Sequence, residues 1–172
     1  MDIANGEGIG ISLFVQGCHF HCKNCFNSST WDFNSGEEWT KQKEDDFLKL
    51  ADKPHVKRIS ILGGEPLADK NLSGVLSFVN KIRHLYGDTK TIWLYTGYTW
   101  EEIIDEQFED LGNGYSRWTD RALIVCQCDV LVDGRFIDEQ KDLSLRWRGS
   151  KNQRVVDIKK SLKSRDAIIY CE

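Results

Sequence analysis

Several features that define other protein classes are missing from this chain of 172 residues. No apolar run approaches the ~20 residues that a transmembrane helix requires, so no membrane-spanning segment is predicted. Residues 1–7 contain neither a basic region nor an apolar stretch, so no secretory signal is expected. Proline occurs only twice while aromatic residues make up 11% of the chain, a composition that excludes a largely disordered protein. We expect a folded cytoplasmic protein with no membrane partner.

An excess of basic residues is missing too. The formal net charge is −4, which argues against a nucleic-acid-binding protein. The charges are nevertheless uneven. Residues 146–165, the basic segment, hold eight Lys or Arg and one acid, whereas residues 101–110, the acidic segment, hold six acids and no base. Both segments can be solvated faces, or the basic segment can bind an anionic ligand or partner.

Cysteine, by contrast, is well represented, with six in the chain. Thiols in the cytosol stay reduced, so metal binding or redox work is favoured over disulfides. Three of the six lie within residues 18–25, which makes that stretch the first candidate site.

Hydrophobic periodicity predicts strands that alternate with helices. Strands are predicted over 8–16, 56–62, 91–95, 122–126 and 130–132, and helices over 43–51, 71–86, 99–111 and 157–163. Such alternation is typical of βαβ units and of a mainly parallel sheet. The chain is too short for a complete (β/α)₈ barrel of ~250 residues. We therefore predict a single α/β domain, 1–172, built as an open, partial (β/α) barrel.

The cysteines Cys18, Cys22 and Cys25 follow the first predicted strand in a C-x₃-C-x₂-C pattern. Ligands of α/β proteins gather at this end of the strands, and the spacing lets three thiolates face one centre. A structural zinc site needs four protein ligands, and a fully ligated 4Fe–4S cluster needs four cysteines. Three cysteines would leave one iron of a cluster open to bind a substrate or cofactor.

The alternative is a zinc site whose fourth ligand is a residue other than these three cysteines. The candidates are His19, His21, Cys126 and Cys128. The last two lie two residues apart on a predicted strand, where alternate residues share a face. We interpret them as small buried side chains, and Cys171 as incidental.

A second candidate is the turn Gly63-Gly64-Glu65-Pro66, which closes the second predicted strand. Glycines let a ligand approach the backbone closely, and carbonyls at a strand end can accept hydrogen bonds from an ammonium group. Glu65 adds negative charge, so the turn suits the amino-acid head group of a ligand. The same four residues are also compatible with an ordinary turn.

Taken together, the cysteine pattern and the Gly-Gly-Glu-Pro turn resemble those of the radical S-adenosylmethionine enzymes. Further stretches extend the resemblance over nearly the whole chain and narrow it to the activases of anaerobic ribonucleoside-triphosphate reductase. These stretches are 12–18, 25–31, 93–98, 130–136 and 148–153.

The resemblance implies that Cys18, Cys22 and Cys25 hold a 4Fe–4S cluster whose open iron binds S-adenosylmethionine. It also implies a set of cofactor contacts: Asn24, Cys25, Phe26, Gly63, Gly64, Glu65 and Thr96. One-electron cleavage would give a 5′-deoxyadenosyl radical, which would abstract hydrogen from a glycine of the reductase. The implied partners are that reductase and an electron donor such as a flavodoxin. Two alternatives remain, a pyruvate formate-lyase-type activase and a non-catalytic zinc module.

Overall fold

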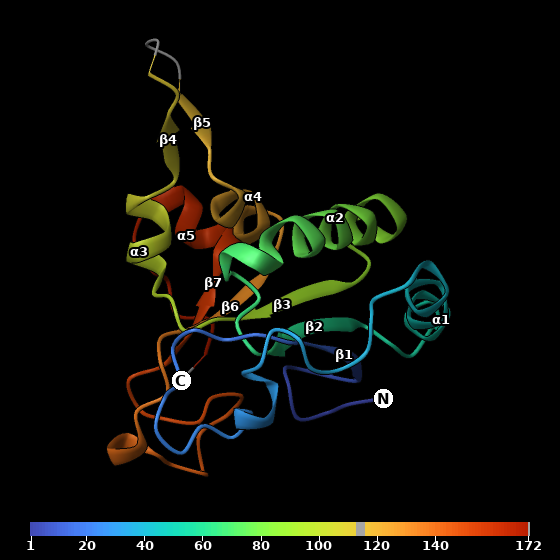
Figure 1. The fold of residues 1–172 in the computed structure, drawn as a ribbon, viewed down its shortest axis with the longest axis horizontal. Helices are drawn as coiled ribbons and strands as arrows, with labels where there is room; N and C mark the ends of the chain where they lie inside the picture. Colours follow the sequence, from blue (N-terminus) through green and yellow to red (C-terminus); the bar gives the residue numbers. More distant parts are fainter. Residues whose placement is uncertain (113–115, 172) are drawn as a thin grey trace.

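A five-stranded sheet runs through the molecule and carries its other elements (Figure 1). The computed structural model describes residues 1–112 and 116–171. The strand order is β1-β2-β3-β6-β7, with bounds Gly10–Val15, Arg58–Gly63, Thr91–Tyr95, Val130–Asp133 and Arg154–Asp157. All neighbours pair in parallel except β7, which is antiparallel to β6. The predicted α/β class with a mainly parallel sheet is confirmed, and no closed barrel forms among the described residues.

The helices cover one face of this sheet (Figure 1). Their bounds are Lys41–Ala51 for α1, Asp69–Tyr86 for α2, Trp100–Asp105 for α3, Asp120–Cys126 for α4 and Ile158–Ser164 for α5. Local signals start several of them. The Thr40 side chain accepts from the Lys43 amide at α1, and Thr99 and Glu102 form a reciprocal capping box at α3. Apolar residues of α1, α2 and α4 pack on β1, β2 and β3 to form the main core.

The opposite face of the sheet, called the loop face below, carries alternate strand residues, and among the described residues none of α1 to α5 lies over it. Trp93, Val130, Val132 and Val155 form a second, smaller core there, against which Trp147 packs. Because successive strand residues point to opposite faces, β3 sends Ile92 and Leu94 to the helices and Trp93 to the loop face. The cover of the loop face is the segment 134–153 and both ends of the chain.

Two predicted elements are wrong, and some strands were not predicted. Residues 122–126 belong to helix α4 and not to a strand, because Thr119 accepts from the Ala122 amide and starts a helix. A short apolar run does not distinguish a buried helix from a strand. The helix predicted over 99–111 ends at Asp105, and β4 (Phe108–Asp110) follows, paired antiparallel with β5 (Ser116–Trp118). Strand β7 was not predicted, since its sequence lies inside the basic segment.

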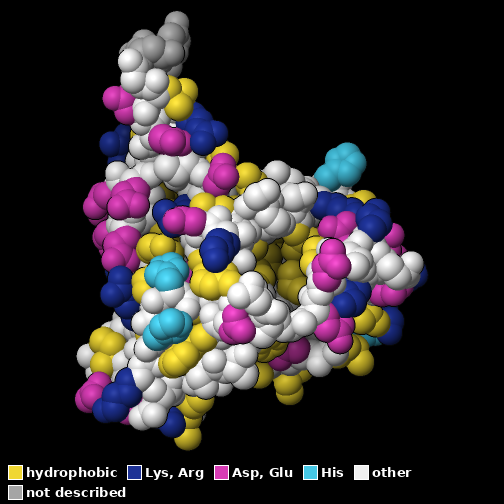
Figure 2. All heavy atoms as spheres, in the orientation of Figure 1, with side chains coloured by type: hydrophobic (Ala, Val, Ile, Leu, Met, Phe, Trp, Pro, Cys, Tyr) yellow, Lys and Arg dark blue, Asp and Glu magenta, His cyan; other side chains and the backbone are white. Residues whose placement is uncertain are grey.

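Some side chains of the basic and acidic segments form ion pairs. Arg154 of β7 bonds to Asp133 at the end of β6 and, at 3.0 and 2.7 Å, to Glu101 of α3. Lys159 pairs with Asp88 and Asp129 at 2.8 and 3.0 Å. Figure 2 shows acidic side chains gathered over α3. Of these ion pairs, Arg154–Glu101 joins the two segments, and the others bind the basic segment to acids elsewhere in the chain.

A polar cluster, which we call the plug, fills the lower end of the loop face. Arg58 is fully buried on β2, and its guanidinium bonds to the Asp2 carboxylate at 3.3 Å, to the Asn5 carbonyl and to Ser60. Ser12 donates to the same carboxylate at 2.5 Å. The plug ties the first residues of the chain to the sheet.

Among the described residues, no helix combines the length and apolarity that crossing a bilayer requires.

Asp2→Ala is expected to lower the free energy of unfolding by about 3 kcal/mol, because it leaves the buried Arg58 charge without its carboxylate. Burial raises the pKa of Asp2, but hydrogen bonds from Ser12 and Ala4 and the Arg58 charge outweigh it and lower the pKa. A lowered pKa means that this stabilisation is lost as the pH falls through the folded-state value. Urea unfolding at pH 7 and pH 3 measures both effects. Asp46→Ala on the α1 surface is the control and should change stability by less than ~1 kcal/mol.

Candidate cluster and cofactor site

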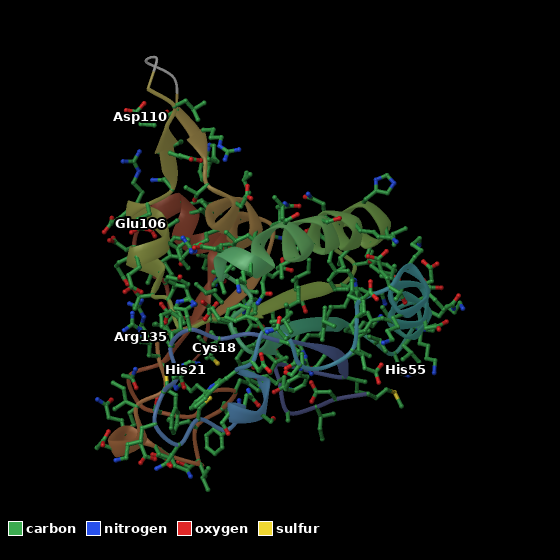
Figure 3. All side chains as sticks on the ribbon, in the orientation of Figure 1. Cys18, His21, His55, Glu106, Asp110 and Arg135 are labelled. Carbon is green, nitrogen blue, oxygen red and sulfur yellow. The ribbon has the colours of Figure 1, made fainter. Side chains whose placement is uncertain are left out.

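A pocket of about 400 Å³ lies at the carboxyl ends of the parallel strands. Its walls come from the loop after β1, the turn after β2, the end of β3 and the segment 134–153. Most of the predicted site residues line it: Cys18, Cys22, Cys25, Phe26, Gly63, Gly64, Glu65 and Thr96. Asn24 does not, because its side-chain amide donates to the Asp138 carboxylate at 2.6 Å. Figure 3 shows Cys18, His21 and Arg135 on the same side of the molecule.

The cysteine loop is held at both ends. The Gly17 and Cys18 amides donate to the carbonyls of Thr30 and Trp31, at 2.8 and 3.0 Å, so the loop closes on itself. Within it, His21 and Asn24 adopt positive φ angles of 48° and 56°, which let the chain turn sharply between the cysteines. The three thiols consequently line one pocket although six residues lie between the first cysteine and the last.

The donor set suits an iron–sulfur cluster. Burial raises the pKa of the Cys18 and Cys22 thiols, while backbone hydrogen bonds act in the opposite direction at both. Metal binding must displace these protons, so loading of the site releases protons. Among residues 1–112 and 116–171, no three metal-binding side chains gather round a single ion. A 4Fe–4S cluster offers a separate iron to each thiolate, so its ligands need not meet at one point.

The Glu65 carboxylate is buried beneath the pocket wall and fully used by the protein. One oxygen accepts from the Leu67 amide at 2.9 Å and from the Thr96 hydroxyl at 2.7 Å, and the other accepts from the Gly97 amide at 2.7 Å. Glu65 thus joins the turn after β2 to the end of β3. The resemblance predicts that Glu65 contacts the cofactor, and in this structure its carboxylate also positions the turn.

The turn also packs tightly against the cysteine loop. The Gly64 amide donates to the Val15 carbonyl at 2.8 Å, and the Glu65 amide donates to the Gly17 carbonyl at 2.7 Å. A Cβ atom on Gly64 would lie 2.4 Å from the Gly17 oxygen. Only glycine fits here, because the Gly17 backbone lies so close to Gly64; the backbone angles of Gly64 do not require it.

Comparison with known proteins decides the family. The model of a 4Fe–4S single cluster domain matches residues 4–156. The chain is 42% identical to the anaerobic ribonucleoside-triphosphate reductase-activating protein of Vibrio cholerae, over 89% of this chain and 90% of that protein. The protein of the same name from Escherichia coli K12 is 40% identical over 89% and 91%, and that of bacteriophage T4 is 31% identical over 90% and 87%. No solved structure matches.

The chain belongs to the family of anaerobic ribonucleoside-triphosphate reductase-activating proteins. Membership confirms the resemblance to radical S-adenosylmethionine activases and the enzyme class. It also confirms the predicted cofactors, a 4Fe–4S cluster and S-adenosylmethionine.

The residues that a zinc site would have required lie outside the pocket in this member of the reductase-activating family. The Nε2 atom of His19 is 3.3 Å from the Tyr98 hydroxyl, and the His21 ring packs 4.8 Å from the Trp31 ring. Cys126 ends α4, and Cys128 is buried in the main core, where its thiol contacts the Ile124 carbonyl at 3.2 Å. Burial raises the pKa of both thiols. Cys128 is thus a core residue, as predicted.

Sequence reasoning missed a group of pocket residues in this reductase-activating protein: Tyr95, Arg135, Phe136, Trp147 and Arg148. Arg135 could have been found, since it follows the Asp133-Gly134 turn at a strand end. Tyr95 directly precedes the predicted contact Thr96. The rest of the segment 134–153 gave no such signal, because its position over the pocket depends on tertiary contacts.

The raised pKa of the Glu65 carboxyl predicts how its contribution to stability changes with pH. Burial raises its pKa from 4.5 to about 7, against the three hydrogen bonds that it accepts. Between those values the folded protein keeps a proton that the unfolded chain has released, so the Glu65 contribution to stability falls as the pH rises. Glu65→Gln leaves the Gly97 amide without its acceptor and is expected to cost about 1–3 kcal/mol at pH 5, and less at pH 8. Urea unfolding at both pH values checks this, and a cost that grows with pH would contradict it.

Proposed function

We propose that this chain generates a glycyl radical on anaerobic ribonucleoside-triphosphate reductase. The observation that carries the proposal is the pocket in which Cys18, Cys22 and Cys25 face the Gly63-Gly64 turn. The reductase is the protein named in the curated relatives. Those names favour it over the target of a pyruvate formate-lyase-type activase.

In this proposal the three cysteine thiolates hold the cluster. When bound, the cluster supplies the electron that cleaves the sulfonium of S-adenosylmethionine, giving methionine and a 5′-deoxyadenosyl radical that takes hydrogen from a glycine Cα. The cofactor brings the hard chemistry, and the protein supplies orientation and exclusion of water.

The chain's own residues orient the cofactor around the pocket. The backbone of Gly63 and Gly64 accepts its amino group, and Cys25 and Phe26 lie along it. Phe26 packs edge-on against Phe136 at 5.3 Å, so two rings shield the reacting atoms from water. Thr96 and Glu65 act together, since their side chains are hydrogen-bonded at 2.7 Å. Asn24 acts through the shape of the cysteine loop, because its amide is engaged by Asp138.

Other parts of the proposal concern the whole molecule. The chain acts as one domain, 1–172, whose sheet is an open, partial barrel around the pocket. A flavodoxin-like donor in the cytoplasm supplies the electron. Basic side chains near the pocket, Arg146, Arg148 and Lys151, dock the reductase, so their reversal to glutamate weakens binding.

Anaerobic reconstitution with iron and sulfide, followed by reduction with S-adenosylmethionine and the reductase, tests the function. A glycyl radical signal on the reductase, with one 5′-deoxyadenosine released per radical, is the expected result. A signal on pyruvate formate-lyase alone would favour that activase instead. A colourless protein that binds one zinc and cleaves nothing would overturn the proposal.

A further inference from the structure

The start of the chain also lines the pocket. Ala4 and Asn5, which belong to the N-terminal segment held by the plug, are among its lining residues. The plug fills the space between the first residues and β2 beside this part of the pocket. Its inner half lies below the cysteine loop, between Phe14 of β1 and Leu145 and Trp147 of the segment 134–153.

Three buried donors of this pocket have no hydrogen-bond acceptor among the described residues. Two of them are the Tyr95 hydroxyl and the Arg148 Nε atom. Buried polar atoms in folded proteins nearly always have a partner, so an unpaired donor that lines a pocket indicates a ligand acceptor. Trp31 Nε1 is a third such donor in the same pocket.

The plug does not satisfy Tyr95, although Arg58 and Asp2 are close enough to influence its pKa. The Asp2 carboxylate already accepts from Arg58, Ser12 and Asn5. The Asn5 carbonyl already accepts from Arg58 and from Ser60 at 2.6 Å. The acceptor for the tyrosine hydroxyl must therefore come from what enters the pocket.

The arrangement separates two kinds of chemistry. At the rim, Gly63 and Gly64 offer backbone to an ammonium group. In the inner half, Arg148 offers donors only, and the Tyr95 hydroxyl has a hydrogen to donate, between apolar walls. The last residue of β3 and the residue after it divide accordingly, since Thr96 bonds to Glu65 whereas Tyr95 packs on the loop face. Carbonyl oxygens, which accept and never donate, match the inner half.

Resting on the proposed function, we infer that this inner half receives the glycine-containing segment of the partner protein, with Tyr95 and Arg148 donating to its backbone carbonyls. A peptide segment that carries glycine presents such carbonyls without bulky side chains. Space on this wall is restricted, because a Cβ on Gly149 would lie 2.9 Å from the Phe26 ring and 3.1 Å from the Phe136 ring. A narrow, donor-lined chamber next to the cysteines suits a chain whose glycine Cα must approach the cofactor.

The test compares two products of the reconstituted protein with the full-length reductase: 5′-deoxyadenosine released and glycyl radical formed. Tyr95→Phe is expected to raise the ratio of the first to the second by about 5- to 10-fold, as expected for one lost neutral hydrogen bond. Arg148→Gln is expected to raise it by about 10- to 100-fold, since a charged donor is removed. The reductase concentration for half-maximal radical formation should rise in both variants.

Tyr86→Phe is the matched control, because the Tyr86 hydroxyl donates to the Leu48 carbonyl at 3.1 Å on the helix side of the sheet. Its product ratio should equal that of the wild type. If Tyr95→Phe and Arg148→Gln lower both products equally, the two residues contact the cofactor and the inference is wrong. An unchanged ratio with unchanged yields would overturn it too. A wild-type protein that cleaves S-adenosylmethionine but leaves no radical on the reductase would instead refute the proposed function.

Discussion

Cys22→Ala is expected to abolish cleavage of S-adenosylmethionine. Cys22 lies between the other two cysteines and lines the pocket with them. Without the Cys22 thiolate, a cluster would have only two protein ligands. The loss of activity should therefore exceed the roughly 100-fold that follows removal of an outer-shell partner of a metal site. Iron and sulfide content, the absorption of the reconstituted protein and 5′-deoxyadenosine release measure the outcome.

Cys126→Ala is the control for this variant. Cys126 is also a free, half-buried cysteine, but it ends α4 and lies outside the pocket. It should load iron and cleave the cofactor like the wild type. Retention of full iron and activity by Cys22→Ala, or their loss in Cys126→Ala, would mean that the cluster is held elsewhere.

Gly64→Ala is expected to have the second largest effect. The new methyl group would meet the Gly17 and Thr30 carbonyls at 2.4 and 2.9 Å, and both belong to the backbone that closes the cysteine loop. Overpacking of this kind costs about 1–3 kcal/mol of stability. A displacement of the loop by about 1 Å can lower the rate by roughly 100-fold. Thermal unfolding and 5′-deoxyadenosine release at saturating cofactor measure the two effects.

Gly74→Ala provides the matched comparison. Gly74 lies inside α2, and a Cβ there meets nothing within 4 Å. Alanine is favoured over glycine in a helix interior by about 1 kcal/mol, so this variant should be more stable and equally active. Equal behaviour of the two variants would show that the turn does not hold the cysteine loop.

The cysteine loop and the turn were predictable because each is a local pattern. Cys18, Cys22 and Cys25 lie within eight residues, and Gly63 to Pro66 are consecutive. The strands β1, β2 and β3 follow simple alternation or short apolar runs, and the predicted ranges agree with the structure within two residues.

What the sequence did not reveal depends on distant contacts. Strand β7 exists because Val155 pairs with Val132, more than 20 residues away, and its flanking charges are neutralised by α3 and β6. The apolar run 122–126 becomes a helix because Thr119 caps it and the core has room for a helix there. The role of Glu65 depended on Thr96 and Gly97, which a turn motif does not include.

The segment 134–153 that covers the pocket has a consequence for biosynthesis. About 110 residues separate Cys25 from Gly134. At the usual pace of ~5–20 residues per second, the thiols leave the ribosome roughly 5 to 20 s before their cover is made. The nascent chain therefore exposes three cysteines to any oxidant during translation. Until residues 134–153 are made, the three thiols lack the cover that this segment gives them in the finished fold.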